Sequence, residues 1–234
     1  MSIFAIGDLH LSFQTKKPMD IFGEQWRDYE EKIKNNWNEE IKENDLVILV
    51  GDFSWSMKLE DTILDFNFIH NLPGTKILIK GNHDYWWTSL TKMNNFMKEN
   101  NFYDINFIQN NAFYYENYAI VGTRGWTFSD SENAEKMLNR ELIRLENSIL
   151  SVENRENKKI ICAMHYPPIT IEMVKKNETS PYIELLKKYK IDNCYYGHLH
   201  GKAHADAVEG IFNNVNLNLI SSDYLNFKPK KIVE

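Results

Sequence analysis

The chain has 234 residues, of which 43% are hydrophobic and 26% are charged. These values are close to those of globular domains and exclude a disordered chain. The net charge of −6 argues against duplex nucleic acid as the main partner, because an acidic surface repels the phosphate backbone. A small phosphorylated substrate stays possible, since a bound metal can supply local positive charge. We expect a single domain over residues 1–234, and the sequence leaves the oligomeric state open.

The two cysteines, Cys162 and Cys194, are too few for a disulfide framework or a cysteine-based zinc site. The N-terminal sequence MSIFAIGDLH has no basic segment, and its apolar run is too short for a signal peptide. No apolar run reaches the roughly 18–20 residues of a membrane span. We therefore expect a cytoplasmic protein with no membrane partner.

The first half of the chain predicts buried strands that alternate with helices. Three short apolar runs predict strands over residues 2–6, 46–50 and 76–79. Apolar residues at helical spacing predict helices over residues 25–43, 59–70 and 88–98.

The second half begins with a different pattern. Residues 106–122 alternate apolar and polar side chains around Asn110-Asn111 and Glu116-Asn117, which predicts hairpins of an antiparallel sheet. A long charged helix follows over residues 131–154, with Ser131 or Asp130 as its N-cap. Further elements are expected as strands over 159–164, 193–196 and 215–220 and as a helix over 181–189. Together these elements predict a mixed α/β architecture.

Acidic, histidine and amide side chains collect at the carboxyl ends of the predicted strands, where ligands bind in α/β sheets. The segments are Asp8-Leu9-His10, Gly51-Asp52, Gly81-Asn82-His83-Asp84, His165 and Gly197-His198-Leu199-His200. Carboxylate oxygens and imidazole nitrogens suit zinc, iron and manganese, and one aspartate can bridge two ions. The pattern therefore predicts a two-metal site that clamps a phosphoryl oxygen and generates a hydroxide near neutral pH.

The series G-D-L-H, G-D, G-N-H-D, H and G-H-L-H resembles the calcineurin-like metallophosphoesterase superfamily. The segments 51–55, 81–87 and 122–126 resemble those of a bacterial subgroup of predicted phosphohydrolases within it. The match spans residues 7–200. It implies a four-layer α/β/β/α sandwich with mixed central sheets and two divalent or trivalent transition-metal ions (Mn, Fe or Zn). The ligands that it implies are Asp8, His10, Asp52 and His200 for the first ion, and Asp52, Asn82, His165 and His198 for the second.

The resemblance also implies roles in the reaction. His83 is expected beside the phosphate as a general acid or an electrostatic stabiliser, oriented by Asp84. A hydroxide held by the metals would attack phosphorus in line, while the metals and His83 stabilise the developing charge. The implied activity is hydrolysis of the mono- or diester bonds of a small phosphorylated molecule.

Several features leave alternatives open. Protein Ser/Thr phosphatases of this superfamily carry a G-D-x-x-D-R-G pattern, and residues 51–57 have neither its second acidic residue nor its arginine, which argues against that activity. Arg124 could bind phosphate from another loop or pair with a structural carboxylate. Trp55 and Trp87 follow ligand positions closely and could stack on substrate or pack the loops together. His204 is expected at the surface or beside the ligands. A nuclease of the same superfamily and a non-catalytic binding scaffold are the alternative functions.

Overall fold

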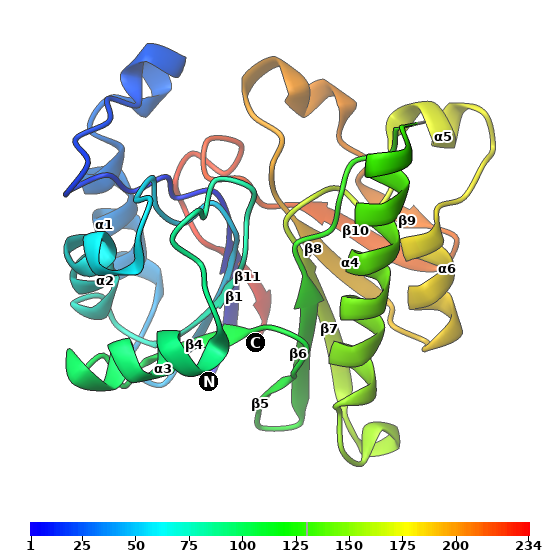
Figure 1. Ribbon diagram of the computed structural model, residues 1–234, viewed down its shortest axis with the longest axis horizontal. Coiled ribbons are helices and arrows are strands. Elements are labelled where there is room, and N and C mark those ends of the chain that lie inside the picture. The colour runs from blue at the N-terminus through cyan, green and yellow to red at the C-terminus, as the bar shows by residue number, and fades with distance from the viewer. Residues whose placement is uncertain (130) are drawn as a thin grey trace.

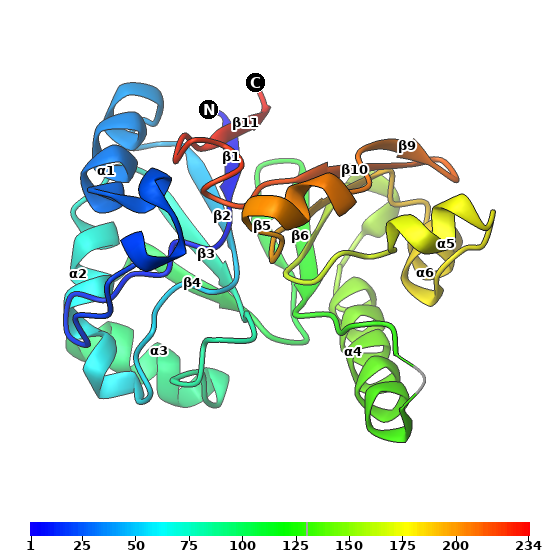
Figure 2. The same ribbon diagram turned by 90° about the horizontal axis from the view of Figure 1, so that it is seen from above.

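The computed structural model describes residues 1–129 and 131–234, so Asp130, one of the two expected N-caps, lies outside the described residues. Two β-sheets pack face to face, and helices cover the outer face of each sheet (Figure 1; Figure 2). The expected four-layer α/β/β/α sandwich is therefore confirmed.

The first sheet has five strands in the order β11-β1-β2-β3-β4. They are β1 (Ile3–Ile6), β2 (Leu46–Val50), β3 (Thr75–Ile79), β4 (Ile105–Ile108) and β11 (Lys230–Val233). Strands β1 to β4 run parallel, and β11 lies antiparallel to β1 at one edge. Every residue of β1 and β2 is buried, which explains their unbroken apolar sequences.

The second sheet has six strands in the order β5-β6-β7-β8-β10-β9. They are β5 (Phe113–Tyr115), β6 (Tyr118–Thr123), β7 (Lys159–Met164), β8 (Asn193–Tyr196), β9 (Gly210–Phe212) and β10 (Val215–Leu219). Strands β6, β7, β8 and β10 run parallel, and the outer strands β5 and β9 are antiparallel to their neighbours. The loops that follow the parallel strands consequently leave each sheet at one end.

The helices form the two outer layers. The first sheet is covered by α1 (Tyr29–Glu40), α2 (Ile63–His70) and α3 (Leu90–Glu99), and the second by α4 (Glu132–Leu150), α5 (Ile171–Lys175) and α6 (Pro181–Lys188). Short 3-10 helices are η1 (Asp20–Phe22), η2 (Glu24–Trp26), η3 (Leu59–Thr62), η4 (Arg155–Asn157) and η5 (Gly201–Asp206). Within the described part of the chain, every helix is too short or too polar to span a membrane.

Three buried apolar layers hold the sandwich together. Trp37 and Phe66 pack under the helices of the first sheet, and Leu145 and Leu186 pack under those of the second. A third cluster, which includes Ile48, fills the space between the sheets. Neighbouring residues of one strand pack in different apolar layers, because successive side chains point to opposite faces of the sheet.

The hairpin expected around Asn110-Asn111 is wrong. Strand β4 pairs in parallel with β3 in the first sheet, whereas β5 pairs with β6 in the second. Asn110 has φ 64° and Asn111 accepts a hydrogen bond from the amide of Gln109, so this turn carries the chain from one sheet to the other. Alternating polarity shows that a strand is half exposed but not which strand it pairs with. The hairpin around Glu116-Asn117 is confirmed.

Candidate metal centre

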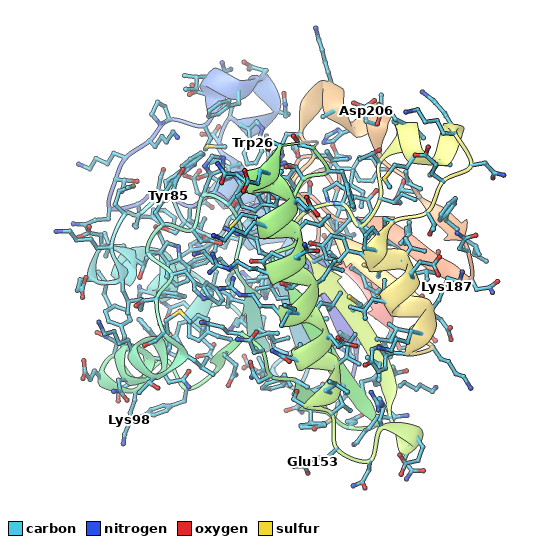
Figure 3. The ribbon with its side chains drawn as sticks, turned by 45° about the vertical axis from the view of Figure 1, so that its right-hand side comes forward. Trp26, Tyr85, Lys98, Glu153, Lys187 and Asp206 are labelled. Carbon is cyan, nitrogen blue, oxygen red and sulfur yellow. The ribbon has the colours of Figure 1, made fainter. Side chains whose placement is uncertain are left out.

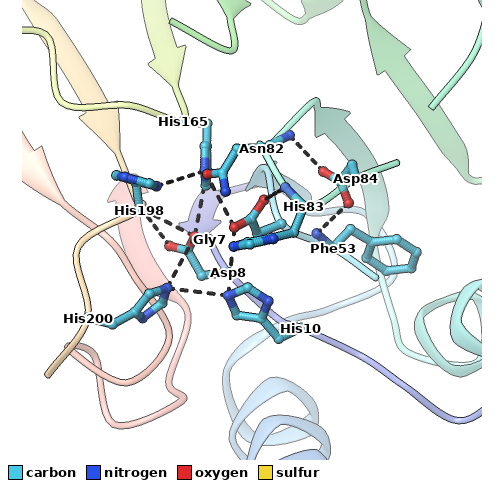
Figure 4. A network of polar contacts seen from close by, with 12 residues as sticks. Gly7, Asp8, His10, Phe53, Asn82, His83, Asp84, His165, His198 and His200 are labelled. Atoms are coloured by element: carbon cyan, nitrogen blue, oxygen red, sulfur yellow. Dashed lines mark hydrogen bonds and ion pairs between the residues drawn. The ribbon is translucent and has the colours of Figure 1, made fainter. Parts of the chain in front are cut away.

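Loops from β1, β2, β3, β7 and β8 bring the expected ligands to one place at the carboxyl ends of the two sheets. Figure 4 shows the side chains from these loops pointing toward one another. The cluster contains Asp8, His10, Asp52, Asn82, His83, His165, His198 and His200. The structure thus joins all seven expected metal ligands and the expected catalytic histidine.

The first group of possible ligands consists of Asp8, His10 and His200, whose ligand atoms lie within 4.8 Å of one another. The Nε2 atoms of His10 and His200 are 3.3 Å apart. The Nε2 atom of His200 is 3.7 Å from Oδ1 of Asp8. One carboxylate and two imidazoles on this scale could hold one transition-metal ion.

The second group consists of Asp52, His165 and His198. Its centre is His165, whose Nε2 lies 3.3 Å from Nδ1 of His198 and 3.5 Å from Oδ2 of Asp52. The side-chain oxygen of Asn82 lies 2.6 Å from the same Nε2 and adds a neutral oxygen ligand to the group.

Asp52 lies between the two groups. Its Oδ2 is 3.8 Å from Nε2 of His10 in the first group and 3.5 Å from Nε2 of His165 in the second. Its Oδ1 accepts a 2.8 Å hydrogen bond from the backbone amide of His83, which fixes the orientation of the carboxylate. This position suits a ligand that two ions share.

The charges of the cluster also fit cations. Burial and the neighbouring Asp8 raise the pKa of Asp52 to about 8. Burial alone would raise the pKa of Asp8 too, but His200, His165 and His10 hold it well below its usual value. Two buried carboxylates that oppose each other's ionisation are a favourable site for positive charge.

The hydrogen bonds of His165 provide an independent test of this fit. Its Nδ1 lies 3.0 Å from the carbonyl oxygen of Val50, so Nδ1 carries the proton and donates it. Burial lowers the pKa of His165, which keeps Nε2 unprotonated. Nε2 and the Asn82 oxygen are then two acceptors 2.6 Å apart, and a shared cation stabilises such a pair. The residues present therefore fit a metal ion.

The backbone of the ligand loops is strained and closely packed. Positive φ angles occur at four ligands, namely Asp8 (59°), His10 (48°), Asp52 (48°) and His198 (73°). Non-glycine residues in this region cost of order 1–3 kcal/mol each and concentrate at functional sites. A Cβ at Gly81 would lie 2.1 Å from Oδ1 of Asp52, and one at Gly197 would lie 2.4 Å from Oδ2 of Asp8. Only glycine leaves room for the two carboxylates.

Asp223 belongs to the site and was missed by the sequence reasoning. Its Oδ1 lies 2.8 Å from Nδ1 of His200, and its Oδ2 accepts a 3.0 Å hydrogen bond from the amide of Gly201. His204 lies on the same carboxylate, with Nε2 3.3 Å from Oδ2. A signal existed, because Asp223 follows the carboxyl end of β10 by four residues.

Asp84 does not orient the ring of His83, so that expectation is wrong. Its oxygens instead accept hydrogen bonds from the amides of Phe53 (2.9 Å) and Gly81 (2.7 Å) and from the indole of Trp86 (3.0 Å). The buried carboxylate joins the loop after β2 to the loop after β3, and so holds Asp52 and Asn82 in place. The Nδ1 atom of His83 has no hydrogen-bond partner among the described residues.

Trp55 lies beside the cluster. Its ring stacks on His10 at 4.8 Å and contacts His83 at 4.5 Å between centroids. It also lines a pocket of about 330 Å³. The same pocket is lined by Trp26, by His83 and by His10 and His200 of the first ligand group. In Figure 3, Trp26 and Tyr85 lie toward one end of the molecule and Lys98 and Glu153 toward the other.

Trp87 and Arg124 lie at a different pocket, of about 210 Å³. The indole of Trp87 donates a 2.8 Å hydrogen bond to Gln109, and its side chain is buried. Arg124 forms an ion pair with the buried carboxylate of Glu141 at 3.3 Å, which is the structural pairing that the sequence left open. A substrate contact for either residue stays a prediction.

Solved structures with the same fold have low sequence identity to this chain. A phosphopantetheinyl hydrolase from Mycobacterium tuberculosis has a TM-score of 0.58 at 10% identity, covering 99% of this chain and 95% of its own. A protein of unknown function from Aquifex aeolicus has a TM-score of 0.53 at 17% identity, with coverage of 98% and 95%. A protein of Thermus thermophilus, TT1561, has a TM-score of 0.55 at 14% identity, with coverage of 99% and 97%.

The search of curated proteins found no match. The family model for calcineurin-like phosphoesterases matches residues 1–202, which include every loop of the ligand cluster. That range exceeds half of the chain, and the strand-end ligands described above lie within it. The chain therefore belongs to the calcineurin-like phosphoesterase family.

Proposed function

We propose that this protein is a dimetal-dependent phosphoesterase that hydrolyses the ester bond of a small phosphorylated molecule. The observation that carries the proposal is the position of Asp52 between two complete groups of ligands, at 3.8 Å from His10 and 3.5 Å from His165. Asp8, His10, Asp52 and His200 would hold one ion, and Asp52, Asn82, His165 and His198 would hold the other.

Two bound ions would polarise the phosphoryl oxygens and activate a water molecule at neutral pH. The protein would keep this geometry in place through contacts outside the ligand set. Val50 fixes the ring of His165 and Asp223 fixes the ring of His200. Asp84 holds the loops that carry Asp52 and Asn82, so ligand positions would change little during turnover.

His83 would act on the substrate rather than on metal. Its backbone amide is bound to Asp52, which leaves the ring at the rim of the cluster against Trp55. Burial and the neighbouring His165 and Lys17 lower the pKa of His83, so a neutral ring is favoured in the protein alone. A neutral imidazole still donates one N–H. This supports electrostatic stabilisation of a phosphoryl or leaving oxygen more than full proton transfer.

The pocket beside His83 supplies room for the organic part of the substrate. Trp26 and Trp55 contribute aromatic walls, and Lys202 adds a cation at the rim. A volume of about 330 Å³ is at the low end of small-molecule sites, which favours a small ligand over a polymer. Trp26 is buried, and Trp55 already stacks on His10 with Nζ of Lys17 3.0 Å from its ring centroid, so a planar group would stack on Trp55 by displacing Lys17.

Hydrolysis of para-nitrophenyl phosphate and bis-para-nitrophenyl phosphate tests the proposal and separates monoesterase from diesterase activity. With manganese added, the protein should hydrolyse at least one of them, and a chelator should abolish the reaction. Asp206→Asn, at an exposed position of η5, serves as the control variant. Failure of the metal-loaded protein to hydrolyse either ester would contradict the proposal.

A further inference from the structure

The pocket of about 210 Å³ beside Trp87 lies between the two sheets, where the loops after β3, β4 and β6 meet α4. Three basic side chains line it, and they are Lys80, Arg124 and Arg144. Glu141 is its acidic residue. Lys80 is two residues from Asn82, so the pocket adjoins the second group of ligands without including any of them.

Glu141 neutralises only one of the three positive charges of these basic side chains. It is fully buried, and its Oε1 accepts from Arg144 at 2.7 Å and from Arg124 at 3.3 Å. Its Oε2 accepts a 2.5 Å hydrogen bond from the hydroxyl of Thr123. One carboxylate against two guanidinium groups and one ammonium leaves about two positive charges at this pocket.

Several hydrogen-bond donors of the pocket have no acceptor within the described residues. The Nε atom of Arg124 is buried without a partner. Lys80 forms no hydrogen bond or ion pair with any described residue. The oxygen of Gln109 is occupied by the indole of Trp87, which leaves its amide NH₂ to donate. Lys80 and Gln109 are only half-buried, and their donor groups can also reach water. A buried donor ordinarily has an acceptor, so the Nε atom of Arg124 points to a bound acceptor in this pocket.

We propose that this pocket binds a small tetrahedral oxyanion of the phosphate type. Guanidinium and ammonium groups suit such an ion, because charge-assisted hydrogen bonds to phosphate are strong. The volume of about 210 Å³ lies below the 300–1,000 Å³ of sites for drug-sized ligands, so it suits a single anionic group. The anion is either a free ion or a second acidic group of a substrate.

Calorimetric titration of orthophosphate into chelator-treated protein at low ionic strength tests this inference without any catalysis. One ion per chain should bind. Lys80→Gln, which leaves the pairs of Glu141 intact, and Arg144→Gln should each weaken binding roughly tenfold or more. Lys187→Gln, which removes only a surface pair with Glu184, should bind phosphate as the wild type does.

The inference is overturned if orthophosphate does not bind, or if Lys80→Gln and Arg144→Gln bind it as tightly as the wild type. It is also overturned if His83→Ala, rather than these variants, abolishes binding, because the ion would then lie in the metal cluster. Circular dichroism of each variant confirms that the fold is retained.

A second experiment, which rests on the proposed function, distinguishes the two sources of the anion. With manganese-loaded protein, KM is compared for a substrate with one phosphoryl group and for the same substrate with two. If the pocket holds part of the substrate, Lys80→Gln raises KM for the doubly phosphorylated compound alone. If it holds a free ion, KM is unchanged for both compounds while orthophosphate binding is still lost.

Discussion

Replacement of Asp223 by asparagine tests how the protein orients one of its metal ligands. The side chain of Asp223 is 1% exposed, and one of its carboxylate oxygens lies 2.8 Å from Nδ1 of His200 while the other accepts a hydrogen bond from the amide of Gly201. This contact directs Nε2 of His200 toward Asp8 and His10. An asparagine keeps one acceptor oxygen, but its NH₂ group then faces either the Nδ1–H of His200 or the backbone N–H of Gly201, and two donors cannot form a hydrogen bond. The ring of His200 should then lose its fixed orientation.

The expected loss is roughly 10–100-fold in metal affinity, the usual effect of removing a partner of a ligand histidine. Only the ion bound by Asp8, His10 and His200 should be affected, because Asp223 does not touch the ligands of the second group. Competition with a chromophoric chelator for manganese or zinc measures both affinities in one titration. Asp206→Asn, an exposed change of the same kind in η5, the 3-10 helix that follows His200, is the matched control.

Unchanged affinities in Asp223→Asn would refute this reasoning. Equal weakening of both ions together with a lower melting temperature would also refute it, because Asp223 would then support the fold and not one ligand.

Three further predictions concern catalysis, substrate and pH. His83→Ala should keep both ions but slow turnover roughly 10²–10⁴-fold; loss of metal in that variant would make His83 a ligand instead. Trp55→Ala should raise KM for a nucleotide-like ester and change it little for glycerol phosphate, whereas equal weakening with lower thermal stability would make the ring structural. Burial raises the pKa of Asp65 from 3.8 to about 6, although Ser54 and Phe13 donate hydrogen bonds to it. The folded state therefore binds more protons than the unfolded state between these values, and stability falls by about 3 kcal/mol as pH rises through them. Urea titrations of the metal-free protein at pH 4 to 7 measure the free energy of unfolding, and in Asp65→Asn this part of its decline with pH should be absent. If the free energy of unfolding of the variant falls with pH as steeply as that of the wild type, the assignment is contradicted.

The sandwich and the ligand cluster could be predicted because their signals are local. Apolar runs such as Leu46–Val50 mark strands buried on both faces, and that strand has the predicted bounds. The polar residues that follow such runs meet in space, because parallel strands end at the same edge of a sheet. His83 and the seven expected ligands were placed together by this rule.

Other features depend on contacts that a sequence does not show. The pairing of β4 with β3, and not with β5, depends on which sheet the turn at Asn110 enters. Asp84 follows His83 in the chain, yet its side chain points to the amides of Phe53 and Gly81. Asp223 follows the end of a predicted strand, which places it near the ligands, but it lies 23 residues from His200 and no motif shows that the two side chains are hydrogen-bonded. Supporting hydrogen bonds of this kind are set by packing and not by spacing.

The sharing of Asp52 between two ions is the central claim, and the metal content of Asp52→Asn measures it most directly. Wild-type and variant protein are loaded with manganese, freed of excess ion by gel filtration, and analysed by elemental mass spectrometry. We expect two ions per chain in the wild type and almost none in the variant, with the circular dichroism spectrum unchanged. Two tightly bound ions in Asp52→Asn would contradict the account.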